Sequence, residues 1–149
     1  MAFLTYVYIV AAFLVANSMQ ANYQPCATGP IPKNVNIIGC NTLPCNFKRG
    51  SFAEAAIAFT VADNTKTLRP VVDVQLGNTN IKYPLPEQNA CKNLVDGQCP
   101  LDKGEVVTYK LKMPIEKIYP KISLTIQLTL VGDHDTPHVC LRIPAMVVD

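Results

Sequence analysis

One stretch of strict alternation constrains the fold of this chain more than any other feature. From Ile122 to Leu130 every second residue is a large aliphatic side chain, and the residues between them are Ser, Thr or Gln. A period of two places the aliphatic residues on one face of a β-strand and the polar residues on the other. The apolar face must be covered, either by a second sheet or by a ligand. We therefore predict a half-buried strand, and what covers it bears directly on function.

Other parts of the chain carry the same signature between turn-forming segments. Residues 52–61 contain alanines that would also suit a helix, but Ile57-Ala58-Phe59-Thr60-Val61 is rich in β-branched and aromatic side chains and favours a strand. Two prolines within residues 81–86 restrict that segment to a sheet edge. About seven strands are predicted in all, at residues 35–40, 52–61, 71–76, 81–86, 107–113, 122–130 and 138–148.

This pattern predicts an all-β fold, an immunoglobulin-like sandwich of two antiparallel sheets. The chain has no Trp, which excludes the Cys…Trp…Cys arrangement of antibody domains. Hydrophobic residues make up 49% of the chain and charged residues 16%, so the inward faces are large and nearly free of charge. These faces either pack into a solid core, which composition alone favours, or splay around an apolar cavity of ligand size. Periodicity cannot distinguish the two, because both use the same faces.

The N-terminal stretch has a different character. Residues 2–16 are almost wholly apolar, and no charged side chain precedes Lys33. This run of about 15 residues is shorter than the roughly 20 that span a membrane, and small residues follow it at Ala16, Ser18 and Ala21. We interpret residues 1–18 as a secretory signal peptide, cleaved between residues 16 and 21, and residues 19–149 as one soluble domain. The alternative is an uncleaved N-terminal helix.

All six cysteines follow this segment, as expected for a protein of an oxidising compartment. No C-x-x-C pair is present, which argues against zinc ribbons and thioredoxin-like chemistry. Six cysteines allow 15 pairings. Two local pairs suggest themselves and leave a third that would join the two ends of the domain: Cys40 with Cys45, Cys91 with Cys99, and Cys26 with Cys140.

Charge and motifs exclude several classes of function. The net charge of +2 comes from dispersed side chains, so nucleic-acid binding is not predicted. No nucleophile elbow, phosphate loop, dinucleotide motif or H-E-x-x-H occurs, and no enzyme is predicted. The sequence D-H-D-x-x-H at residues 133–138 could in principle hold a metal. We interpret it instead as a polar hairpin turn followed by an outward-facing His138, and we expect neither a metal nor a cofactor.

Short motifs along the chain resemble those of one family. They are Gly39-Cys40 with Pro44-Cys45, Arg49-Gly50, Phe59-Thr60, Tyr83-Pro84-Leu85-Pro86 ahead of Cys91, Cys99-Pro100-Leu101, Pro114-Ile115, Tyr119-Pro120 and Cys140-x-x-Ile143-Pro144. No single motif is specific, but six cysteines in this order with Cys-Pro and Tyr-Pro so placed are specific together. From Cys26 to Val147 the chain resembles the MD-2-related lipid-recognition (ML) family. Within it, the resemblance is to the branch of Niemann-Pick type C intracellular cholesterol transporter 2 and the group 2 mite allergens.

The resemblance implies the three disulfides proposed above and a lipid cavity between the two sheets. It also implies that the cavity mouth is lined by an aromatic residue of the Pro-rich strand, an aliphatic residue and a Tyr-Pro pair, which here are Tyr83, Ile115, Tyr119 and Pro120. Tyr83 stands where sterol carriers typically have Phe, and its hydroxyl would narrow the pocket or bond a ligand head group. Further contacts with the lipid are expected from Phe59, Leu124 and Ile126.

We therefore expect a secreted, non-enzymatic, monomeric protein that binds and transfers a sterol or a similar apolar lipid. Transfer would involve transient contact with a membrane or a lipid transporter, and delivery to the lysosome is compatible with the sequence. Alternatives within the family are carriage of a fatty acid or semiochemical and recognition of a glycolipid in innate immunity. Outside it, the alternative is a secreted, disulfide-stapled adhesion or inhibitor module with a solid core. The presence of a cavity distinguishes a carrier from such a module.

Overall fold

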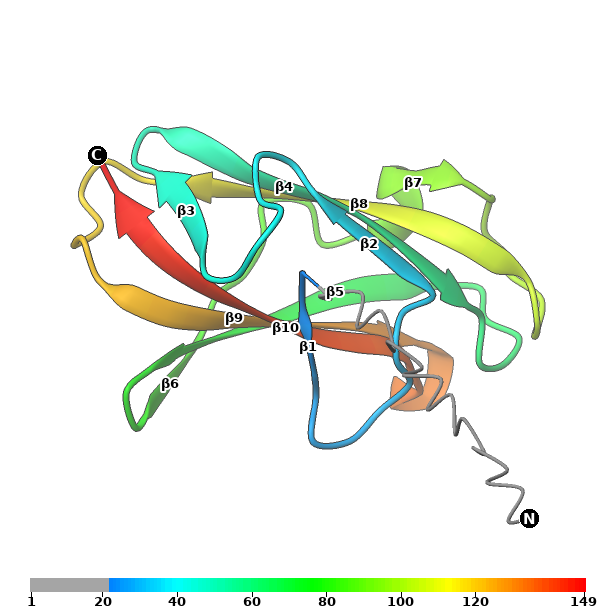
Figure 1. Ribbon diagram of the computed structural model, residues 1–149. Coiled ribbons are helices and arrows are strands. Elements are labelled where there is room, and N and C mark those ends of the chain that lie inside the picture. Colours follow the sequence, from blue (N-terminus) through cyan, green and yellow to red (C-terminus); the bar gives the residue numbers. More distant parts are fainter. Residues whose placement is uncertain (1–21) are drawn as a thin grey trace, which may run out of the picture.

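Two sheets pack face to face in the computed structural model, which describes residues 22–149 (Figure 1). Sheet A has the strand order β1 (Gln24–Pro25), β10 (Pro137–Val148), β9 (Ser123–Gly132), β5 (Leu68–Leu76) and β6 (Thr79–Lys82), and β3 (Cys45–Lys48) also pairs with β10. Sheet B has the order β2 (Asn34–Ile37), β4 (Ser51–Thr60), β8 (Val106–Ile115) and β7 (Leu94–Asp96). The predicted signal peptide lies outside the described residues.

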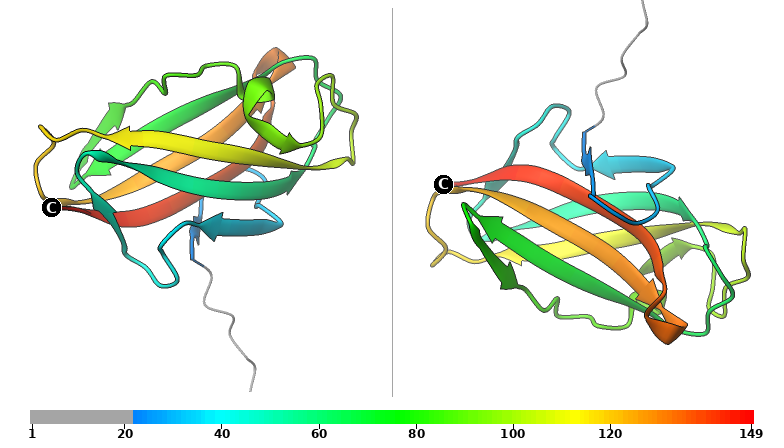
Figure 2. Two further views of the ribbon diagram at one scale, coloured as in Figure 1. Left: turned by 90° about the horizontal axis from the view of Figure 1, so that it is seen from above. Right: turned by 90° about the horizontal axis from the view of Figure 1, so that it is seen from below.

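The antiparallel sandwich and its three disulfides are confirmed. Figure 2 shows β4 and β8 crossing over β5, β9 and β10. The disulfides join Cys26 to Cys140, Cys40 to Cys45 and Cys91 to Cys99, with sequence separations of 114, 5 and 8 residues. The Cys26–Cys140 disulfide joins the residue that follows β1 to strand β10, and so it links the two ends of the domain. No helix within residues 22–149 is long and apolar enough to cross a membrane; the helical segments there are the 3-10 turns η1 (Ala90–Asn93) and η2 (Asp133–Asp135).

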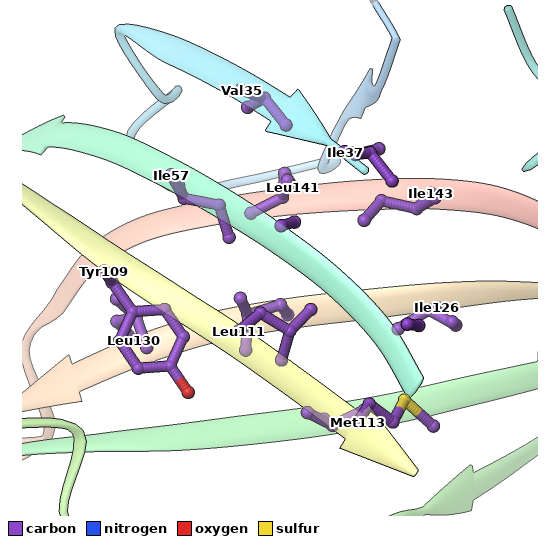
Figure 3. Close-up of a cluster of buried hydrophobic side chains, with 14 of the residues drawn as sticks. Val35, Ile37, Ile57, Tyr109, Leu111, Met113, Ile126, Leu130, Leu141 and Ile143 are labelled. Carbon is purple, nitrogen blue, oxygen red and sulfur yellow. The ribbon is translucent and has the colours of Figure 1, made fainter. Parts of the chain in front are cut away.

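The core forms because the alternating strands turn their apolar faces toward each other. Figure 3 shows Ile57 and Leu111 of sheet B opposite Leu141 of sheet A. On β9 the alternation predicted from sequence places Leu128 and Leu130 in this core with 0% exposure. Every second residue of β4 and β8 is buried in the same way. The polar residues between them face outward, as a period of two requires.

Side-chain size changes along the inner face of sheet B. At one end of the β4–β8 ladder, Phe59 lies opposite Val107, and both side chains are buried. At the other end β4 contributes only the small side chains of Ala53 and Ala55. Alanines fill less of the space between two sheets than large side chains do, because interiors are close-packed and volume must be supplied by side chains. The sandwich is therefore filled more completely at the Phe59 end than at the Ala53 end.

Three local features differ from the sequence predictions. The segment predicted as an edge strand at residues 81–86 begins earlier and ends at Lys82, before the first proline. The strand β3 was not predicted, and it runs parallel to β10 with Phe47 opposite Val147. The prediction that His138 faces outward is wrong: its side chain is 1% exposed, because the β9–β10 ladder shifts register between Pro137 and Val139. Such a bulge adds a residue to one strand and disturbs the inward–outward alternation.

Candidate functional site

An apolar cavity of about 200 Å³ lies between the sheets at the end where β4 carries alanines. Its walls come from β5, β6 and β9 of sheet A, from the end of β8 in sheet B, and from the loop between β8 and β9. Two further side chains from β3 and β10 complete the wall. The lining residues are Phe47, Val74, Leu76, Ile81, Tyr83, Met113, Ile115, Tyr119, Pro120, Ile122, Leu124, Ile126 and Val147. No charged side chain is among them.

The alternating strand β9 supplies one wall. Its inward face divides into two parts, because Leu128 and Leu130 are fully buried in the core while Leu124 and Ile126 border the cavity. Leu124 is only partly buried, which shows that the cavity approaches the surface at the start of the strand. Met113 and Ile115 of β8 lie on the opposite wall. The inward faces of β8 and β9 therefore pack against each other's sheets in the core, and beyond that region the same faces line the cavity.

Six of the seven side chains predicted to contact a lipid are gathered at this cavity. The six are Tyr83, Ile115, Tyr119, Pro120, Leu124 and Ile126. Phe59 is the exception: it is 0% exposed, and it lies in the filled part of the core. Seven lining residues had not been singled out as lipid contacts, namely Phe47, Val74, Leu76, Ile81, Met113, Ile122 and Val147. The alternation within residues 107–113 and 138–148 signals Met113 and Val147, but nothing local signals Phe47, whose placement depends on the parallel pairing of β3 with β10.

Two tyrosine hydroxyls meet beside the cavity, where both side chains are only partly buried, and this partly exposed edge is called the mouth below. The Tyr119 hydroxyl lies 3.3 Å from that of Tyr83, and the Tyr83 hydroxyl donates to the carbonyl oxygen of Pro114 at 3.5 Å. Burial raises the pKa of Tyr83 well above its usual range, and the hydrogen bond from Tyr119 and the negative charge of Glu116 act in the same direction. The Tyr83 phenol therefore stays protonated throughout the physiological range.

The loop that carries Tyr119 and Pro120 is tied to neighbouring elements. Arg49, which follows β3, donates from Nη1 to the carbonyl oxygen of Tyr119 at 3.3 Å. Arg49 also pairs with the Asp149 carboxylate, which accepts a second bond from Lys121 Nζ at 2.9 Å. Lys121 and Arg49 lower the pKa of Asp149. Exposed ion pairs contribute little stability, so these contacts position the loop more than they strengthen the fold.

The D-H-D-x-x-H sequence at residues 133–138 has a structural role. Asp133 accepts hydrogen bonds from the backbone N–H groups of Lys66 and Thr67, which lowers its pKa. His138 is buried and accepts a hydrogen bond at Nδ1 from the backbone N–H of Ala62 at 3.1 Å, and burial lowers its pKa. Within residues 22–149, no group of three or more His, Cys, Asp or Glu side chains is arranged to hold a metal ion.

Other hollows on the molecule are chemically different. A larger one, of about 470 Å³, lies on the outer face of sheet A and is lined by polar and charged side chains including Asp73, Gln127 and Arg142. The lining of the cavity between the sheets, by contrast, is apolar apart from the hydroxyls of Tyr83 and Tyr119. A disulfide-bonded β-sandwich with an apolar cavity opening between its sheets is a structure of lipid-recognition type.

The chain belongs to the ML domain family, whose model matches residues 20–147. This confirms the resemblance found in the sequence. Members of the family bind lipids and are not enzymes, so the expectation of a non-enzymatic protein is also confirmed.

Individual relatives match over most of their length. The chain is 27% identical over 149 residues to the NPC intracellular cholesterol transporter 2 of Bos taurus, covering 99% of each chain. It is 26% identical over 129 residues to the mite group 2 allergen Lep d 2 of Lepidoglyphus destructor, covering 87% of this chain and 89% of the other. Among solved structures, a Niemann-Pick type C2 protein from the Japanese carpenter ant superposes with a TM-score of 0.75 at 24% identity, covering 85% of this chain and 98% of that one.

Proposed function

We propose that the protein is a secreted carrier that holds one sterol, or an apolar lipid of similar size, between its two sheets and transfers it without chemical change. The cavity with its apolar lining carries the proposal. Each 100 Å² of lipid surface removed from water contributes about 2.5 kcal/mol, so a lipid can bind with few polar contacts. Similarity to a cholesterol transporter over nearly the full length of both chains supports a sterol as the first ligand to test.

The size of the cavity bears on how a ligand enters. Its volume of about 200 Å³ is smaller than the roughly 300–1,000 Å³ of pockets that enclose drug-sized molecules. Loading therefore requires the walls to move apart. The β8–β9 loop is the natural moving part, because Tyr119 contacts Tyr83 across the mouth by a single long hydrogen bond and the ion pairs that tie the loop through Arg49 and Lys121 are solvent-exposed. Transfer then needs the mouth to open toward a membrane or a lipid transporter.

Disulfides and cavity together favour this proposal over a secreted adhesion or inhibitor module with a solid core. Three disulfides with no free cysteine in residues 22–149 suit an extracellular or lysosomal compartment. A module that binds through a surface loop has no need of an unfilled apolar space, which costs packing energy. The cavity is therefore retained at some expense of stability, as expected when a ligand occupies it.

Saturable binding of a fluorescent sterol, dehydroergosterol, tests the proposal. Leu76→Trp places a large ring against the cavity, whereas Gln75→Trp puts the same ring on the neighbouring outward position of β5. We expect one sterol per protein for the native chain and for Gln75→Trp, and at least about tenfold weaker binding for Leu76→Trp. Organic extraction of the natively purified protein followed by mass spectrometry identifies its own lipid. Failure of sterols and fatty acids alike to bind at the cavity would refute a carrier function.

A further inference from the structure

The mouth of the cavity contains a short chain of hydrogen bonds with a fixed direction. The Pro114 carbonyl oxygen has no hydrogen to give, so the Tyr83 hydroxyl must donate to it. With its only hydrogen used in this way, Tyr83 can only accept from Tyr119. The direction therefore runs from Tyr119 through Tyr83 to Pro114. This direction is fixed because a carbonyl oxygen can only accept a hydrogen bond and each hydroxyl has a single hydrogen to donate.

This arrangement leaves acceptors but no donors for a ligand. A tyrosine hydroxyl has one hydrogen and two lone pairs, and both hydrogens of the Tyr119–Tyr83 pair are in use. The Tyr119 oxygen keeps both lone pairs and the Tyr83 oxygen keeps one. The two recorded contacts, at 3.3 and 3.5 Å, are longer than the roughly 2.7–2.8 Å typical of O–H···O bonds. A ligand hydroxyl can bond to either oxygen while both existing bonds are kept, whereas a ketone gains a hydrogen bond only if Tyr119 gives up its bond to Tyr83.

Charge at the mouth also limits which head group fits. The raised pKa of Tyr83 keeps its hydroxyl uncharged, and the Glu116 carboxylate lies near enough to oppose ionisation of Tyr83. The same negative charge disfavours a carboxylate head placed at the hydroxyl pair. The rest of the cavity offers no alternative partner, because its other lining side chains are aliphatic, Phe, Met or Pro. An uncharged group that donates a hydrogen bond is the one that fits.

We propose that the Tyr119–Tyr83 hydroxyl pair is a specificity site that accepts a hydrogen bond from the uncharged hydroxyl of a lipid alcohol and discriminates against the corresponding ketone and carboxylate. The proposal rests on the carrier function above, and it adds the class of head group and the residues that select it. The lipid enters with its apolar body inward and its hydroxyl at the mouth, where water can still reach it. A ketone oxygen has only lone pairs, so it faces the lone pairs of Tyr119 and Tyr83 without a hydrogen between them.

Pairs of probes that differ only in the head group test this. One pair is cholesterol and 5-cholesten-3-one; the other is 2-hexadecanol and 2-hexadecanone, with hexadecanoate as the anionic probe. Affinities are measured by displacement of a fluorescent lipid at pH 7. The native protein should bind each alcohol about tenfold more tightly than its ketone, the size of one net hydrogen bond. Hexadecanoate should bind more weakly than the alcohol of the same chain length.

Tyr83→Phe supplies the decisive variant. Removing the Tyr83 hydroxyl frees the hydrogen of Tyr119, which can then donate to a ketone oxygen, so the alcohol-to-ketone ratio should fall to within about threefold of one. Tyr109→Phe is the matched control, because it removes the hydroxyl of a buried tyrosine that lies in the core cluster of Figure 3 and is not part of the cavity lining. Its ratio should equal that of the native protein.

Three outcomes would overturn the inference. Equal affinity of the native protein for alcohol and ketone would show that the hydroxyl pair does not select the head group. An unchanged preference in Tyr83→Phe would assign the selection to another residue, and a loss of preference in Tyr109→Phe as well would show a general effect of losing a hydroxyl. If no probe of either pair binds, the carrier function itself fails, and that result differs from binding without preference.

Discussion

Tyr119→Asp should abolish lipid binding at neutral pH while leaving the protein folded. Tyr119 is half-buried in the loop between β8 and β9, and its side chain makes one recorded hydrogen bond, to Tyr83. Arg49 holds its backbone carbonyl and not its side chain, so this contact survives the substitution. In the empty protein the new carboxylate stays hydrated at the mouth, and the free energy of unfolding should change by about 1 kcal/mol or less.

A bound lipid would cover that carboxylate. The effective cost of removing an ion from water in a protein is several kcal/mol, and taking about 3 kcal/mol for a group at a partly open mouth predicts roughly 100-fold weaker binding. The same charge at Ile115 is a different experiment, because Ile115 is 3% exposed on β8 and Asp there would destabilise the fold itself. The structure thus makes Tyr119 the informative position of the two.

Fluorescent-sterol titration alongside urea unfolding measures both effects. Tyr119→Asn is the control, since it loses the ring equally and adds no charge. The gap in affinity between Asp and Asn should narrow as the pH falls toward 4: the unperturbed Asp pKa is about 3.9, a covering lipid raises it, and protonation therefore favours the bound state. If the Asp and Asn variants bind equally at pH 7, the lipid does not cover this position, and the assignment of the mouth is refuted.

Three further predictions concern stability. By the chain-entropy model, replacing both Cys26 and Cys140 by Ala should cost about 5 kcal/mol and replacing the Cys91–Cys99 pair about 2.5 kcal/mol, measured by urea unfolding; equal losses would contradict this ordering. Burial lowers the pKa of His138, so as the pH falls the unfolded chain takes up a proton before the folded chain does. The free energy of unfolding should therefore decrease below the ordinary histidine pKa of 6.5, and His138→Gln should flatten the dependence of stability on pH in that range. Gly132→Ala should destabilise by about 1–3 kcal/mol, because the added Cβ would lie 2.4 Å from Nε2 of His138; an unchanged thermal midpoint would contradict that packing.

The alternation of the sequence predicted the strands well because it is a local property. Residues 107–113 lie within β8, residues 122–130 lie within β9 except for Ile122, and the apolar face named from sequence is the face that turns inward. Alternation fails where a register shift intervenes. At Pro137–Val139 the shift buries His138 together with Val139, and no residue in the turn before it announces the change.

Alternation predicts which residues of a strand face inward, but it does not predict whether an inward residue lies in the filled core or at the cavity. Phe59 and Ile126 both occupy inward positions, yet Phe59 lies in the filled core and Ile126 on the cavity wall. The difference depends on what each faces across the sandwich. Part of that signal exists in the sequence, since β4 runs from Ala53 and Ala55 toward Ile57 and Phe59. Whether these small side chains leave a cavity depends on which side chains of the facing sheet lie opposite them.

The sequence by itself determined that this chain forms a disulfide-bonded all-β sandwich of the ML family, because side-chain period, cysteine order and motif spacing are all properties of the chain read in one dimension. The tertiary structure decided where the inward faces touch and where they separate. It brought Tyr83 and Tyr119 to one mouth and added Phe47 to the cavity wall through the parallel pairing of β3 with β10. A cavity is space that two sheets leave between them, so it exists only in three dimensions.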